Sequence, residues 1–165
     1  MEPGTKTGVL DPAQLMKMSR RQLDDLFKAS PPGPVPDGEA QGTAIIAPGT
    51  VFSPKIAEFV RRFAWRGKTF DGKQGMLTSR ILFGLNAIAN VYVDKSWFDG
   101  HDCIVLDYSK TSLIAHWVRD EIRLVAPNFY LGLTYWSKTR LVNFSLRLQL
   151  PAGVDASRGL RHTAS

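Results

Sequence analysis

Two neighbouring residues at the end of an apolar segment, Asp107 and Tyr108, have side chains that can exchange protons with a substrate. A carboxylate and a phenol that open onto one cavity can act as general base and general acid. Arg119 and Arg123 follow along the chain and could hold an anion beside them. The same charges also have a structural interpretation, in which Asp107 pairs with an arginine or caps the following turn. Adjacent strand residues point to opposite faces, so shared chemistry requires the strand to end or bulge here.

A second set of polar side chains lies on the last two predicted strands and could line a cavity in a curved sheet. If these side chains face outward instead, they are ordinary surface, which is the usual state of the polar side of an antiparallel strand. The aromatic residues could either pack in the core or form part of a cavity wall. The candidate ligand-binding residues are Arg119, Arg123, Tyr130, Asn143, Arg147 and Trp65.

No metal site and no cofactor site is predicted. The chain has no Walker loop, no dinucleotide glycine fingerprint and no G-x-S-x-G turn. His101, His116 and His162 lack metal-ligand spacing with one another and with Cys103. Cys103 cannot form an internal disulfide because it is the only cysteine, and its apolar neighbours indicate a small buried side chain.

The segment that carries the first candidates begins as a strand, "CIVLDY", after a turn at "DGHD". The state of residues 111–125 is open. Apolar residues recur there at helical spacing, whereas "DEIRLV" also fits a short strand joined by "APN" to the next one. We favour one or two helical turns followed by the start of a strand.

Two helices are expected upstream. Ser19 and Gln22 have the spacing of a capping box, which predicts a helix from Ser19 that ends before the proline-rich segment "SPPGPVPDG". Ser53 followed by Pro54 predicts a second helix over 53–64, with an apolar stripe and a charged remainder. Residues 1–10 and the tail from 151 to 165 are expected to be disordered.

The remaining segments predict strands. They are "GTAIIAPG", "WRGKTF", "TSRILFG", "NVYV" and a final hairpin, "FYLGLTYW" and "LVNFSLRLQL", in which the last segment alternates strictly. Because regular helices do not separate these strands, the sheet should be antiparallel and curved. The fold class is therefore mainly β (α+β), a single domain over 11–150 with the N-terminal helix and a second helix packed on the sheet.

The composition excludes several classes of protein. The 165 residues are 44% hydrophobic and 22% charged, as in globular domains. The net charge of +6 is spread along the chain, and its densest cluster, Arg61, Arg62, Arg66 and Lys68, is typical of a solvated helix face. We therefore expect no nucleic-acid partner, although an acidic protein partner for this cluster is a lesser alternative. No signal peptide and no membrane span is predicted, and the single cysteine fits a cytoplasmic location.

Taken together, "LDDLFKASPPGPVPDGEAQGT", "WRGKTF", "VRDEIRLVAPNFYLGLTYW" and "VNFSLRL" resemble an uncharacterised bacterial group, the GXWXG-type proteins. The resemblance covers about two thirds of the chain. It implies a small lipocalin-like barrel or half-barrel with helices at its side. The group brings no established activity, so no catalytic residue is carried over from it.

The leading functional expectation is binding of a small, partly apolar ligand, lipid-like or a carboxylate, inside the barrel. The alternative is a cofactor-independent enzyme of the isomerase, hydratase or cyclase type that uses the same cavity. The strand that ends in "RLQL" could also be an exposed edge that pairs with a second copy of the chain in a homodimer.

Overall fold

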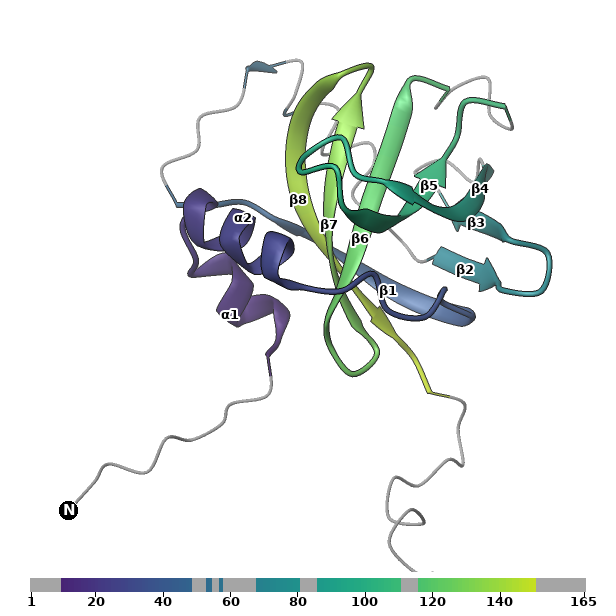
Figure 1. Ribbon diagram of the computed structural model, residues 1–165, viewed down its shortest axis with the longest axis horizontal. Coiled ribbons are helices and arrows are strands. Elements are labelled where there is room, and N and C mark those ends of the chain that lie inside the picture. The colour runs from purple at the N-terminus through teal and green to yellow at the C-terminus, as the bar shows by residue number, and fades with distance from the viewer. Residues whose placement is uncertain are drawn as a thin grey trace, which may run out of the picture.

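The computed structural model describes residues 10–48, 53–54, 57, 68–80, 86–110 and 116–150, and Figure 1 shows its helices beside a curved sheet. The helices are α1 (Pro12–Met16) and α2 (Arg20–Ala29). The strands are β1 (Gly38–Ile45), β2 (Lys68–Asp71), β3 (Met76–Arg80), β4 (Asn86–Lys95), β5 (Asp102–Asp107), β6 (Val118–Ala126), β7 (Phe129–Trp136) and β8 (Thr139–Leu148).

The eight strands form a closed antiparallel barrel in which each strand pairs with its neighbours in sequence. The first and last strands complete the ring, with Ala40 opposite Leu148 and Ile45 opposite Asn143. This confirms the predicted mainly β fold. The end of β8 was considered as a possible exposed edge for a homodimer, but β1 pairs with β8 as far as Leu148 and occupies that edge.

Alternation of side chains produces a buried cluster on each side of the barrel wall. The cluster inside the barrel includes Phe70, Ile104, Leu106, Tyr108, Ile122, Tyr130, Phe144 and Leu146. The cluster on the outer side includes Leu15, Leu23, Phe27, Ile45, Val105, Phe129, Leu131 and Leu133. The final hairpin therefore has the predicted alternation, but both of its faces are buried, because the helices cover the outer one.

The helices cover the outer face because their apolar residues lie on one side. Ser19 accepts a hydrogen bond from the backbone of Gln22 and the Gln22 side chain bonds back, which confirms the predicted capping box. Leu23 and Phe27 of α2 are fully buried against the barrel, and each contributes about 1.5–3 kcal/mol of transfer free energy. Helix α1 was not predicted, although Asp11 and Gln14 form a second capping box.

One end of the barrel is crossed by residues 30–37, which we call the proline segment. The backbone of Leu124 on β6 donates to Pro31 O, and the hydroxyl of Tyr130 on β7 donates to Pro34 O. At the far side, Gly72, in the turn after β2, donates to Asp37. Strands β2 and β6 lie on opposite sides of an eight-stranded ring, so the proline segment spans this end, running from α2 toward β2 (Figure 1).

The segment around residues 111–125 differs from the expectation. Residues 118–126 form a strand, β6, with a register shift between Leu124 and Ala126, where we favoured helical turns before a strand. Residues 111–115 lie outside the described part. Pairing with β5 and β7 on both sides stabilises the extended state over the helical spacing of the same residues.

Several other expectations fall on residues outside the described ranges. They concern the ends, 1–9 and 151–165, most of the helix expected at 53–64, and Trp65. Of that helix, Ala57 donates its amide hydrogen to Ser53 O, as in a first helical turn. Neither described helix has the length and apolar character needed to cross a bilayer.

Candidate functional site

The two proposed acid–base residues lie on opposite sides of the barrel wall. Tyr108 belongs to the cluster inside the barrel and is 4% exposed. Asp107 lies on the outer surface, where it accepts hydrogen bonds from the Tyr92 hydroxyl at 2.9 Å and from the Ser109 backbone at 2.9 Å. The strand does not bulge here, so the structure does not bring the pair to one cavity.

The hydrogen bonds of Asp107 keep it ionised. Burial alone would raise the pKa of this carboxyl, but the bonds from Ser109 and Tyr92 outweigh burial and lower the pKa. Burial and the same hydrogen bond raise the pKa of Tyr92 to about 12. The arrangement matches the structural interpretation of Asp107, in which the carboxylate caps the turn that follows β5.

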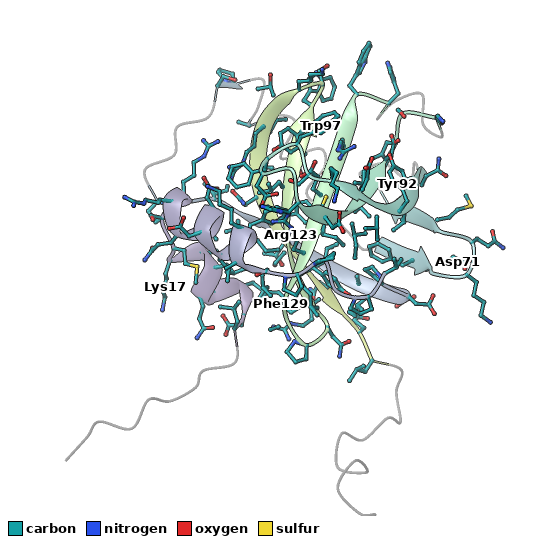
Figure 2. The ribbon with its side chains drawn as sticks, viewed as in Figure 1. Lys17, Asp71, Tyr92, Trp97, Arg123 and Phe129 are labelled. Atoms are coloured by element: carbon teal, nitrogen blue, oxygen red, sulfur yellow. The ribbon has the colours of Figure 1, made fainter. Side chains whose placement is uncertain are left out.

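Arg123 has a structural position between α2 and the barrel (Figure 2). Its guanidinium makes a two-pronged ion pair with Asp99 at 2.6 and 2.7 Å. Its remaining hydrogen bonds go to the backbone oxygens of Phe27, His101 and Asp102. All five N–H donors are thus used within the protein, and Arg123 has none left for a ligand.

Arg119 is likewise engaged on the outer face. It donates to Glu121 and to Lys95 O, and its guanidinium stacks 4.3 Å from the ring centre of Trp97. Glu121 is fully buried and also accepts from Ser96 and from the Trp97 backbone. These contacts hold the β4–β5 turn against β6, which is the role of a structural ion pair.

The candidate polar residues of β8 do not line the inside of the barrel. Asn143 and Arg147 point outward, because they alternate with the inward residues of β8. Arg147 lies 4.6 Å from the ring centre of Phe129 and donates to Leu10 O. Tyr130 does point inward, but its hydroxyl is bonded to Pro34 O of the proline segment. The five candidates within the described ranges therefore form no common site, and Trp65 lies outside those ranges.

The interior carries a polar pair that the sequence analysis did not identify. Asp120 and Thr134 are each 4% exposed, and the Thr134 hydroxyl donates to the Asp120 carboxylate at 2.8 Å. Asp120 has at least one further interaction. It alternates with Val118 and Ile122, which point into the barrel. That alternation would have revealed Asp120 as an inward acid had 118–126 been recognised as a strand.

The polar pair lies toward the end of the barrel opposite the proline segment. The inward positions of β6 are, in order, Val118, Asp120, Ile122 and Leu124, and the last of these is the one beneath the proline segment. Asp120 is therefore one inward position, about 7 Å, from the other rim. At that rim Trp136 pairs with Val118 and is 37% exposed.

The inward face of β1, which pairs with β8, is built from small residues. Ala40, Gly42 and Ala44 of β1 face inward across from Leu148, Leu146 and Phe144 in the register. Gly42 and Ala44 keep partial exposure despite this position. Among the described residues, no group of three His, Cys, Asp or Glu side chains is placed to hold a metal ion.

Comparison with known proteins supports the fold. The crystal structure of a protein from Thermomonospora curvata matches 84% of this chain and 93% of its own, with a TM-score of 0.57 and 16% identity. At that identity the likeness concerns the fold alone. No protein-family model matches the sequence, and a search of curated proteins finds no match. The resemblance to the GXWXG-type group stays a prediction.

Proposed function

We propose that this protein binds a small, partly apolar molecule inside the barrel, with the polar end of the molecule at Asp120 and Thr134. The observation that carries the proposal is that the interior combines apolar side chains with a buried polar pair. The described inward side chains form an apolar cluster, and a buried carboxylate with its hydroxyl partner lies near one rim. Such a combination of an apolar wall and a few placed polar groups is typical of small-molecule sites.

The architecture restricts access at one end. Eight-stranded barrels have an interior that side chains can fill or that can hold one small ligand. The inward residues of β1, Ala40, Gly42 and Ala44, are small, and the proline segment covers one end. The ligand would then enter past Trp136 at the opposite rim, which would place its polar end next to Asp120.

The polar pair favours a ligand that donates hydrogen bonds. Thr134 already donates its hydroxyl hydrogen to Asp120, so the Thr134 oxygen keeps acceptor lone pairs for a third group. A hydroxyl or an ammonium can donate to that oxygen. A ligand carboxylate has no hydrogen to donate there. We therefore expect alcohols and amines to bind more tightly than acids of the same chain.

The test uses three ligands with one saturated chain that ends in a hydroxyl, an ammonium or a carboxylate. Native mass spectrometry should show one ligand per protein, and tryptophan quenching should give a dissociation constant about tenfold lower for the alcohol and the amine than for the acid. Asp120→Asn should remove that preference, whereas Asp107→Asn on the outer wall should leave it unchanged. Absence of saturable binding, or an unaltered preference in Asp120→Asn, would contradict the proposal.

A further inference from the structure

A second polar feature lies outside the barrel, where the end of β1 and the start of β8 meet the beginning of α2. A small hollow there has about 20 Å³ of free volume. Its walls combine apolar side chains with one arginine and one amide, contributed by Arg20, Ile45, Ile46, Leu141, Val142 and Asn143. The free volume accommodates roughly one water-sized group.

Asn143, which lines the hollow, carries an unused hydrogen-bond donor. Asn143 is 6% exposed, and its Oδ1 accepts a hydrogen bond from Arg140 at 3.1 Å. Arginine can only donate, so this contact fixes which end of the amide faces Arg140. The Nδ2 group is buried and has no hydrogen-bond partner. A buried donor without a partner costs about 1–3 kcal/mol, which an acceptor in the hollow would recover.

The charge at the hollow is positive. Arg20 is the first residue of α2, and the first turn of this helix contains no acidic residue. The positive end of the helix dipole therefore coincides with an arginine, an arrangement that favours a nearby anion. Within the described ranges Arg20 makes no ion pair, whereas Arg140 on the other side of Asn143 is paired with Asp24.

We propose that this hollow binds a carboxylate attached to a small apolar group. One carboxylate oxygen would enter the hollow and accept from Asn143 Nδ2, Arg20 would supply the opposite charge, and Ile45 and Leu141 would contact the apolar part. This site is separate from the interior, because Asn143 and Ile45 point away from it. The two sites also differ in ligand preference. The hollow binds an anion, whereas the Asp120–Thr134 pair binds a group that donates a hydrogen bond.

The experiment follows the side-chain amide of Asn143 by nitrogen–proton NMR of the full chain. Titration with isobutyrate should shift the Asn143 Nδ2 signals in a saturable manner, whereas isobutanol and sodium chloride should not. A short peptide that ends in valine, tested in parallel with its C-terminal amide form, distinguishes a free acid from a peptide terminus as the source of the carboxylate. Signals that respond to none of the carboxylates would overturn the proposal and leave the hollow to a bound water.

Two variants make the test specific. Arg20→Gln, at an exposed position, should weaken isobutyrate binding about threefold. Asn143→Leu should abolish the isobutyrate-induced shifts of the Ile45 and Val142 methyl groups. Ser145→Ala removes the other unpaired polar atom on β8, which does not line the hollow, and should bind as the wild type does. Equal affinity in wild type, Arg20→Gln and Asn143→Leu would contradict the proposed site.

Discussion

At the scale of single residues, the charged side chains of β6 divide between structure and function according to the face they occupy. Arg119, Glu121 and Arg123 point outward and hold the β4–β5 turn and α2 in place. Asp120 points inward, where it pairs with Thr134. The charged run around residues 119–123 is thus both a structural network and, at one position, a candidate site.

Loss of the Arg123 side chain should destabilise the protein strongly. In Arg123→Met, Asp99 loses its partner and the backbone oxygens of Phe27 and His101 lose a donor. Breaking a buried ion pair from one side costs about 3–5 kcal/mol. We expect the free energy of urea-induced unfolding to decrease by this amount in Arg123→Met. Lys95→Met, which breaks the exposed pair with Asp102, should leave it nearly unchanged; similar effects of both variants would refute the assignment.

The same ion pair should make stability depend on pH. The hydrogen bonds from Arg123 lower the pKa of Asp99 below its ordinary value of 3.8, with burial acting in the opposite direction. A depressed pKa in the folded state means that the unfolded chain takes up the proton first, so stability falls as the pH drops below about 4. Asp99→Asn has no carboxyl at this position, so its stability should fall less than that of the wild type over the same pH range. Parallel stability curves for both proteins between about pH 6 and pH 3 would show that Asp99 is not involved.

At the scale of elements, the proline segment covers one end of the barrel. Gly33 in this segment has a φ of +71°, and a Cβ atom there would lie 2.5 Å from Leu124 Cβ. The segment therefore needs glycine for its backbone conformation and also for its close approach to β6.

Gly33→Ala should destabilise the protein by about 2–4 kcal/mol, the sum of the backbone strain and the steric overlap. Gly100→Ala is the matched control, because Gly100 has a φ of +74° and nothing within 4 Å of the added Cβ. Gly100→Ala should be destabilised only by the backbone strain, about 1 kcal/mol. Thermal unfolding of both variants provides the measurement. If they are equally stable, the proline segment does not pack on β6 as described.

The sequence was informative about elements and uninformative about register. Strict alternation in the last hairpin and the cap at Ser19 correctly predicted β8 and α2, because these signals are local. The face to which Asn143 and Arg147 point could not be predicted, since α2 makes the outer face apolar as well. Cys103 was correctly predicted to be buried, and burial raises the pKa of its thiol to about 12.

The site was harder to predict than the fold because it depends on the strand register. Asp120 and Thr134 become a pair only through the pairing of β6 with β7, and their inward direction follows from closure of the barrel. Asp107 and Tyr108 attracted attention because they are adjacent in sequence, yet adjacency on a strand separates side chains to opposite faces.

At the scale of the whole molecule, closure of the sheet separates an interior, in which Asp120 is buried, from an outer face on which α1 and α2 pack. The proline segment covers one end of the interior, and Trp136 stands at the other rim. This arrangement leads to the central claim, which is that the interior holds the apolar part of a ligand and Asp120 holds its polar end.

The most direct test of that claim is the set of intermolecular nuclear Overhauser effects between the bound alcohol of the ligand series and the protein methyl groups. We predict contacts from the ligand chain to Ile104, Ile122 and Leu146, and from the carbon next to the hydroxyl to the methyl group of Thr134. Contacts only to the outward methyl groups of Leu131 and Leu133, or none at saturating ligand, would contradict the account.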